Sequence, residues 1–142
     1  MIVLDTTILA YAVGDAHALR TPCRRLLTAH GEGRIEATTT IEVIQAFAHI
    51  RARRRTRSDA VTLARHYLSA FAVLAATADD LDRGLALFER LPGLGAFDSV
   101  LAAVALDRGA EALVSADRAF ASVPNLRWID PATSAMRRLV GG

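Results

Sequence analysis

Four of the acidic residues differ from the rest because each lies inside or directly beside an apolar run. Asp5 ends the run "IVL", Glu42 lies within "TTTIEVIQAF", Asp98 lies within "FDSVLAAVAL", and Asp117 follows "ALVSA". Side chains in such runs tend to face the interior, where an unpaired carboxylate is costly. Carboxylates that converge in one cleft repel one another unless a cation neutralises them, so these acids suggest a metal site.

The chemistry of the donor atoms indicates which metal such a site would prefer. A set of carboxylate oxygens favours hard cations such as Mg²⁺ or Mn²⁺, and the four histidines and single cysteine show no spacing typical of zinc. An ion of this kind activates water and stabilises the charge that develops on a phosphodiester during hydrolysis. The sequence therefore predicts Mg²⁺ or Mn²⁺ as the cofactor.

Each acid taken alone also has a local structural interpretation. Asp5 precedes "TTIL" and would serve as a helix N-cap, and Asp117 would serve as a turn residue. Thr39 and Glu42 have the spacing of a capping box. Asp98 falls in the first turn of a predicted helix, where the helix dipole stabilises a negative charge. These alternatives stay open until the four acids are considered together.

The elements that must position these acids follow from the hydrophobic periodicity. The short apolar runs predicted as strands cover residues 2–4, 35–38, 71–74, 112–114 and 126–129. The helical patterns between them cover residues 7–13, 16–30, 41–55, 59–68, 79–91, 96–108 and, as a last short helix, 132–139. Strands separated by helices predict a parallel sheet covered on both faces, because parallel strands need crossover connections.

The predicted fold class is therefore α/β, a three-layer α/β/α domain with a central, mostly parallel sheet of about five strands. The length and apolar content suit one hydrophobic core, so we expect a single domain over residues 1–142. In such sheets ligands bind beyond the carboxyl ends of the strands. Asp5 and Asp117 both follow predicted strands, so we expect them at the same edge.

Composition excludes several other proteins that place an aspartate after a first strand. All 17 basic residues are arginine, whereas haloacid dehalogenase phosphatases and response-regulator receivers both need a lysine. No Gly-Lys-Ser or Gly-Lys-Thr follows a glycine-rich loop, which excludes Walker-type nucleotide binding. The lone Cys23 lies on an apolar helical stripe, so we expect a core residue in a reducing compartment. With no apolar run long enough to cross a bilayer, we expect a cytoplasmic protein.

Four motifs in order, "IVLDTTILAY", "TTTIEVIQ", "FDSVLAAVAL" and "LVSADRAF", resemble the PIN domain. At this length the chain looks like the VapC ribonuclease toxins of bacterial toxin–antitoxin pairs, with a likeness that runs from residue 2 to about residue 128. The resemblance implies a Mg²⁺- or Mn²⁺-dependent endoribonuclease. It also implies that Asp5, Glu42, Asp98 and Asp117 are the catalytic residues and metal ligands.

The same resemblance implies supporting side chains and partners. Thr7 and Ser115 would support the acids, although the family often has Asn or Ser at the first position and Thr at the second. Members are usually dimeric and are neutralised by a small VapB-like antitoxin protein. The alternative is a catalytically silent PIN-like module that binds RNA or a partner protein without cutting.

Arginines are concentrated in the segment "RARRRTR", which ends one helix and enters the following loop. They are Arg51, Arg53, Arg54, Arg55 and Arg57. One interpretation is a solvated helix end whose cations complement the dipole. The other is a patch that binds RNA phosphates beside the acidic cleft, since basic contacts supply most sequence-independent affinity for nucleic acids. The antitoxin is a further possible partner for this patch.

Large apolar residues on two of the predicted helices also have two interpretations. They are Ile44, Phe47, Tyr67, Leu68 and Phe71. Exposed, they would form a groove for an antitoxin helix or a dimer face. Packing in the core is the more frequent explanation for such residues.

Overall fold

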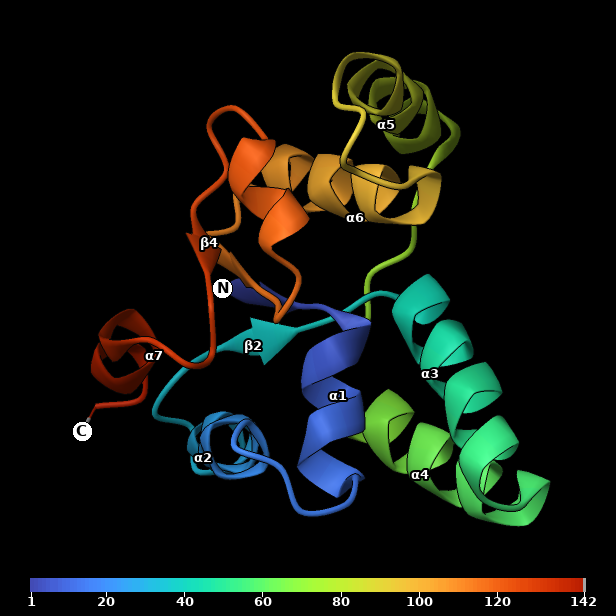
Figure 1. The fold of residues 1–142 in the computed structure, drawn as a ribbon, viewed down its shortest axis with the longest axis vertical. Helices are drawn as coiled ribbons and strands as arrows, with labels where there is room; N and C mark the ends of the chain where they lie inside the picture. Colours follow the sequence, from blue (N-terminus) through green and yellow to red (C-terminus); the bar gives the residue numbers. More distant parts are fainter. Residues whose placement is uncertain (142) are drawn as a thin grey trace.

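The computed structural model describes residues 1–141. It contains a four-stranded sheet of β1 (Ile2–Leu4), β2 (Ala37–Thr38), β3 (Ala112–Val114) and β4 (Trp128–Ile129) in the order β2-β1-β3-β4. Every neighbouring pair is parallel. Helices lie on both sides of the sheet, with α5 and α6 above it and α1 and α2 below it in Figure 1. The predicted α/β architecture with a parallel sheet is confirmed.

The register of the two central strands determines where the acids lie. Leu4 of β1 pairs with Val114 of β3, so both strands end side by side at the same edge. The residues that follow them, Asp5 and Ser115, are therefore neighbours although they are 110 positions apart. All six strand residues of this central pair are buried.

The prediction of a fifth strand at residues 71–74 is wrong. Leu74 forms only an isolated parallel bridge with Thr40, in which the Leu74 N–H donates to the Thr39 carbonyl at 2.9 Å. The pairing does not continue because the chain turns into α3 at Ile41, whose N–H donates to the Leu74 carbonyl at 2.8 Å. The strands predicted at 35–38 and 126–129 are also shorter than expected.

All seven predicted helices are present. Their bounds are α1 Thr6–Val13, α2 Arg20–Gly31, α3 Ile41–Arg54, α4 Arg57–Ala70, α5 Ala78–Arg90, α6 Ala96–Asp107 and α7 Ser134–Leu139. α2 begins later than predicted because the segment before it forms a turn, in which the Leu19 N–H donates to Nδ1 of His17 at 3.1 Å. A short 3₁₀ helix, η1 (Arg118–Ser122), was not predicted.

The capping box predicted from Thr39 to Glu42 is wrong. The N-cap of α3 is Thr40, whose side chain accepts a hydrogen bond from the Val43 N–H at 3.1 Å. Thr39 instead donates its hydroxyl to the Leu4 carbonyl at 2.8 Å. This shift of one residue places Glu42 at the second helical position, where a capping box does not use its carboxylate.

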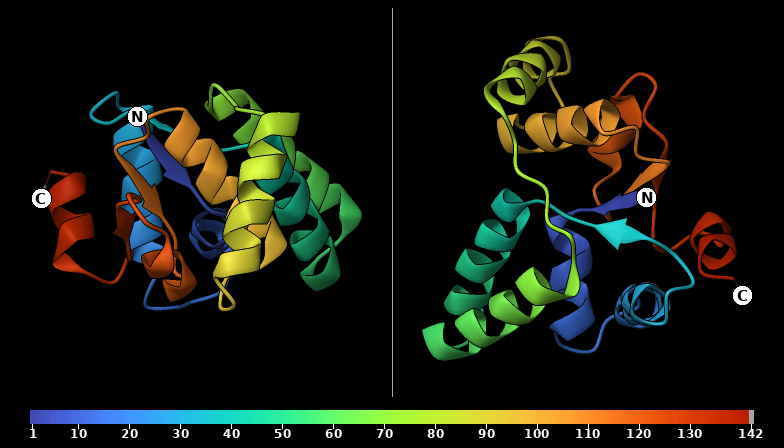
Figure 2. Two further views of the ribbon diagram at one scale, coloured as in Figure 1. Left: turned by 90° about the horizontal axis from the view of Figure 1, so that it is seen from above. Right: turned by 180° about the vertical axis from the view of Figure 1, so that it is seen from behind.

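The apolar residues of α3 and α4 mostly belong to the core. Ile44, Phe47, Tyr67 and Phe71 are at most 7% exposed, whereas Leu68 is 50% exposed. The rings of Phe47 and Tyr67 meet edge to face with centroids 5.1 Å apart. α3 and α4 lie against each other as an antiparallel pair (Figure 2). The four buried side chains therefore belong to the core, and of these five residues Leu68 alone is exposed.

The structure also bears on the predicted burial of Cys23 and on the expected absence of membrane-spanning helices. Cys23 is fully buried, as predicted. None of the helices in the described part of the chain is long and apolar enough to span a bilayer.

Candidate active site

Asp5 lies at the carboxyl edge of the sheet, between β1 and α1. It occupies the N-cap position of α1, yet its side chain makes no capping hydrogen bond. Its Oδ2 instead accepts hydrogen bonds from the Ser115 hydroxyl at 2.6 Å and the Thr7 hydroxyl at 3.2 Å. Asp5 is therefore the N-cap residue of α1 by position, as its sequence context suggested, but its carboxylate is held by two side chains.

The two hydroxyls are themselves held by the loop after β3. Oγ of Ser115 accepts the Asp117 N–H at 2.9 Å, and Oγ1 of Thr7 accepts the Ala116 N–H at 3.0 Å. Each hydroxyl thus accepts from a backbone amide and donates its proton to the carboxylate. This arrangement limits the rotation of the Asp5 side chain, which is only 4% exposed.

Burial raises the pKa of Asp5 above its ordinary value, and the hydrogen bonds from Ser115 and Thr7 oppose the change. Asp98, in the first turn of α6, has a pKa raised to about 7, first by burial and then by the neighbouring charges of Asp5 and Asp117. Three aspartates from three separate elements therefore lie close enough to repel one another. The charges of Asp5 and Asp117 therefore act on Asp98, which places these three acids near one another.

Asp117 also has the local role that its sequence context suggested. It is the N-cap of η1, and its Oδ1 accepts the Ala119 N–H at 2.9 Å. A capping role that occupies one carboxylate oxygen leaves the second oxygen for other partners. Both interpretations of Asp117 are thus compatible.

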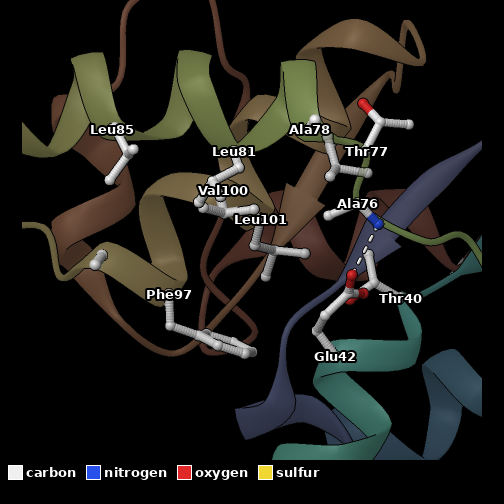
Figure 3. Close-up of a pocket in the computed structure, with 12 residues that line it drawn as sticks. Thr40, Glu42, Ala76, Thr77, Ala78, Leu81, Leu85, Phe97, Val100 and Leu101 are labelled. Carbon is white, nitrogen blue, oxygen red and sulfur yellow. Dashed lines mark hydrogen bonds between the residues drawn. The ribbon is translucent and has the colours of Figure 1, made fainter.

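Glu42 lies in the first turn of α3. Its Oε1 accepts the Ala76 N–H at 2.8 Å (Figure 3), and its Oε2 is buried with no hydrogen-bond partner among the described residues. A buried acceptor without a partner costs about 1–3 kcal/mol. Glu42 also lines an apolar groove of about 490 Å³ between α5 and α6, which Leu85 and Phe97 line as well.

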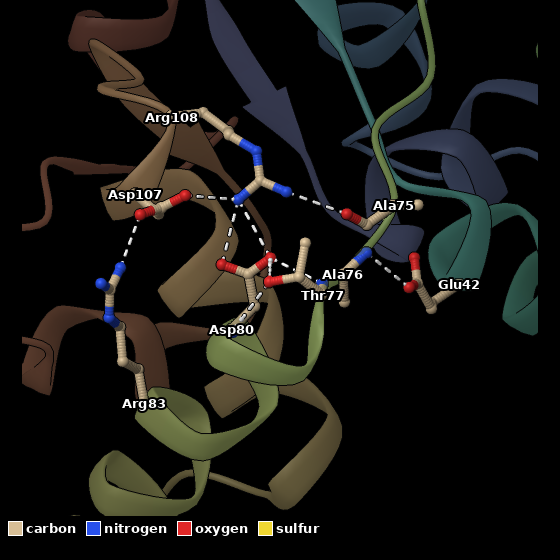
Figure 4. A network of polar contacts seen from close by, with 8 residues as sticks. All are labelled: Glu42, Ala75, Ala76, Thr77, Asp80, Arg83, Asp107 and Arg108. Carbon is tan, nitrogen blue, oxygen red and sulfur yellow. Dashed lines mark hydrogen bonds and ion pairs between the residues drawn. The ribbon is translucent and has the colours of Figure 1, made fainter.

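The backbone that holds Glu42 is anchored by a polar network between α5 and α6 (Figure 4). The Arg108 guanidinium donates to the Ala75 carbonyl at 2.9 Å and to both carboxylate oxygens of Asp80 at 3.0 Å. Asp80 accepts from the Thr77 N–H at 2.8 Å and completes a capping box with that residue. Burial acts to raise the pKa of Asp80, but the hydrogen bonds from Thr77 and Arg108 outweigh it and lower the pKa.

Sequence reasoning missed this network. The spacing of Thr77 and Asp80 is a visible signal for a capping box. No pattern in the sequence indicates that Arg108 reaches the Ala75 carbonyl, or that the Ala76 amide meets Glu42, because both contacts join segments far apart in the sequence that come together only in the folded chain.

The donor set suits a hard cation, because all four predicted ligands are carboxylates. Within residues 1–141, no three histidine, cysteine or acidic side chains surround one point closely enough to share a metal ion as they stand. The aspartates therefore lie near one another without converging, and shared ligation would require rotation about their side-chain bonds. The buried Oε2 of Glu42 is available for a cation.

The arginine-rich segment divides into paired and unpaired side chains. Arg51 is paired with Asp59 at 2.6 Å, and Arg55 with Asp15 at 2.6 Å. The side chains of three others form no ion pair or hydrogen bond with described residues; they are Arg53, Arg54 and Arg57. These three arginine side chains are exposed and remain available to bind phosphates.

The family model that matches this chain describes the PIN domain and covers residues 2–126. The fold and the acidic edge of the sheet thus define a PIN-domain protein. The chain is also 52% identical to the ribonuclease VapC7 of Mycobacterium tuberculosis, over 99% of both chains. It is 34% identical to the ribonuclease VapC23 of M. tuberculosis, over 86% of this chain and 97% of the relative. The chain belongs to the VapC ribonuclease family within the PIN-domain proteins.

Solved structures share the fold at lower identity. The sarcin–ricin loop cleaving toxin VapC20 of M. tuberculosis superposes with a TM-score of 0.71 at 19% identity, covering 89% of this chain and 99% of the toxin. A VapBC2 structure from Rickettsia felis, bound to a promoter DNA fragment, gives a TM-score of 0.71 at 20% identity, covering 92% and 98%.

Proposed function

We propose that residues 1–142 form one nuclease domain that hydrolyses RNA phosphodiester bonds with Mg²⁺ or Mn²⁺. The observation that carries this proposal is the coupled set of Asp5, Asp98 and Asp117 at the carboxyl edge of the sheet. Carboxylates gathered at one edge favour binding of a divalent cation, because the cation removes their mutual repulsion. The 52% identity to a ribonuclease supports the same activity.

In this proposal Asp5, Asp98, Asp117 and Glu42 hold the cation. A bound Mg²⁺ or Mn²⁺ ion supplies water activation and stabilisation of the charge that develops on the scissile phosphate. Other residues of the chain hold these carboxylates in position. Thr7 and Ser115 hold the Asp5 carboxylate, and the Ala76 amide binds Oε1 of Glu42, so that Oε2 is the oxygen that would bind the ion.

Proton release accompanies metal binding, because a ligand carboxylate must be ionised. With a pKa of about 7, Asp98 is partly protonated at neutral pH in the metal-free protein. The cation therefore competes with a proton at this residue. Its apparent affinity should rise with pH between about 5 and 8.

The direct test is cleavage of purified total RNA by the full chain with Mg²⁺ or Mn²⁺, compared with the same reaction in EDTA. Asp5→Asn and Glu42→Gln are expected to reduce cleavage strongly, whereas Asp82→Asn on the exposed face of α5 serves as a matched control. Cleavage that survives both EDTA and Asp5→Asn would refute the metal site. A protein that binds RNA without cutting it under any metal would instead be the catalytically silent module.

We also propose that the protein acts in the cytoplasm as the toxin of a toxin–antitoxin pair, with a VapB-like protein as its antitoxin. Structures with a similar fold include a toxin–antitoxin complex from Klebsiella pneumoniae, with a TM-score of 0.68 at 17% identity. Co-expression with the short neighbouring open reading frame tests the partner. Loss of toxicity and co-purification are the expected results.

The homodimer expected of this family would use the apolar groove between α5 and α6. Its wall includes Leu81, Leu85 and Phe97, each more than 40% exposed, and these three side chains face the same space in Figure 3. Leu85→Asp is expected to convert a dimer into a monomer in light scattering. A mass that does not change would assign the groove to another partner.

The unpaired arginines would contact RNA phosphates outside the cleft. Replacing Arg53 and Arg57 by serine should flatten the dependence of RNA affinity on salt, because each lost phosphate contact lowers the slope by about 0.7–0.9. Arg51 and Arg55 are expected to contribute less, since acidic partners already neutralise them.

A further inference from the structure

A second cavity, distinct from the α5–α6 groove, lies along α1. Its volume is about 310 Å³, and it is bounded by α1, by the turn at residues 14–17 and by the end of α3. The polar or aromatic side chains in its lining include Thr7, Tyr11, His17 and Arg54.

One end of this cavity lies beside a residue that contacts Asp5, one of the proposed metal ligands. Thr7 lines it and donates its hydroxyl to Asp5 at 3.2 Å. Thr6 lines it too, is 8% exposed, and has an Oγ1 with no hydrogen-bond partner among the described residues. A buried hydroxyl without a partner is unusual in a folded protein and marks a position where a ligand would supply the missing contact.

The other end carries a stacked pair of rings. Tyr11 and His17 have centroids 4.5 Å apart and an interplanar angle of 29°. The Leu19 N–H donates to Nδ1 of His17, so the neutral ring carries its proton on Nε2 and can donate it to a ligand. His17 is exposed and Tyr11 is half-buried, so the pair can extend a stack.

The charge at this end is positive. Asp15 lines the cavity, but Arg55 neutralises it at 2.6 Å. Arg54 lines the same cavity and is exposed, with no ion pair in the part of the chain that the structure describes. An unpaired guanidinium beside stacked rings suits a ligand that is both planar and anionic.

We propose that the α1 cavity binds one nucleotide of the RNA substrate next to the scissile phosphate. The base stacks on the Tyr11–His17 pair, and Arg54 binds a phosphate of the same strand. This is the usual way in which proteins hold an unpaired nucleotide. The proposal rests on the nuclease function proposed above. A helix of a partner protein fits the α1 cavity less well, because hydroxyl groups and an arginine line it. The apolar α5–α6 groove offers such a helix a more suitable surface.

The experiment measures binding of fluorescently labelled single-stranded oligoribonucleotides, one for each base, to the full chain in EDTA so that no RNA is cut. Tyr11→Leu is expected to weaken binding about 5- to 100-fold, the range found when one stacking aromatic is removed. Tyr11→Phe keeps the stack and should bind like the wild type. Phe88→Leu removes an exposed aromatic from α5 and is the matched control.

The charged contact is tested in the same titrations. Arg54→Ser should lower the salt slope of RNA binding by about 0.7, whereas Arg137→Ser on α7 should leave the slope unchanged. A Tyr11→Leu protein with native circular dichroism that binds RNA as tightly as Phe88→Leu would overturn the proposal. Loss of antitoxin co-purification with unchanged RNA binding would overturn it as well, and would assign the cavity to the protein partner.

Failure here is distinguishable from failure of the nuclease proposal. If the wild type cuts RNA and Tyr11→Leu binds and cuts equally well, the nucleotide site is refuted and the nuclease stands. If RNA binding depends on Tyr11 but no metal supports cleavage, the nucleotide site stands and the nuclease is refuted.

Discussion

Asp98→Asn should stabilise the metal-free protein at neutral and alkaline pH. The pKa of Asp98 is about 7 in the folded protein against an ordinary value of 3.8, so the folded state retains a proton that the unfolded chain has released. The contribution of Asp98 to stability is therefore fully present below about pH 4 and is lost as the pH rises through 7. Asparagine removes this loss because it does not ionise.

The magnitude follows from the size of the pKa change. A rise of about 3 units corresponds to a ceiling of about 4 kcal/mol at high pH. Asp98 is only partly buried, and solvent screens the repulsion from Asp5 and Asp117, so the expected gain is about 1–2 kcal/mol.

Urea denaturation in EDTA measures this gain. The difference in unfolding free energy between Asp98→Asn and wild type should be about 1–2 kcal/mol larger at pH 8 than at pH 4. Asp82→Asn, which removes an exposed carboxylate from α5, should show no such pH dependence. A gain that is equal at both pH values, or a loss at pH 8, would show that carboxylate repulsion is not what destabilises this edge. Mn²⁺ should stabilise the wild type more than Asp98→Asn, by mass action.

Three more substitutions test the packing around the site. Ser115→Ala removes the 2.6 Å hydrogen bond to Asp5, and we expect a loss of about 1–3 kcal/mol in urea together with a lower kcat at nearly constant KM. Gly84→Ala should destabilise α5 by about 1–3 kcal/mol, because an added Cβ would lie 2.8 Å from Cα of Val100; a higher melting temperature would contradict this. Arg108→Lys cannot reproduce the guanidinium's planar fork, so it should reduce Mn²⁺ affinity in calorimetry while circular dichroism stays native.

Much of the fold was predictable because it depends on local patterns. The buried strands at 2–4 and 112–114 are continuous apolar runs, and every helix except α2, which starts after Leu19, follows a threonine, glycine or aspartate at its N-cap. The four acids were identifiable because carboxylates within apolar runs are rare. The strand predicted at 71–74 failed because its apolar residues pack against helices, and apolar content alone does not distinguish the two environments.

The candidate site depended more on the tertiary structure. Sequence alone left Asp5 between an N-cap and a ligand, and the tertiary structure adds the contacts with Ser115 and Thr7 that hold its carboxylate. Thr39 and Thr40 are adjacent threonines with equal capping propensity. Their contacts with the rest of the chain distinguish them: the Thr39 hydroxyl donates to the Leu4 carbonyl at the end of β1, and Thr40 caps α3.

The sequence by itself determined the residue types, the order of the elements and the edge of the sheet at which the acids gather. These follow from periodicity and from the direction of parallel strands. The tertiary structure decided which side chains hold the acids, where Arg108 reaches and which hydrophobic faces stay exposed. Such contacts join residues up to 110 positions apart, and they depend on strand register and helix packing, which no local pattern specifies.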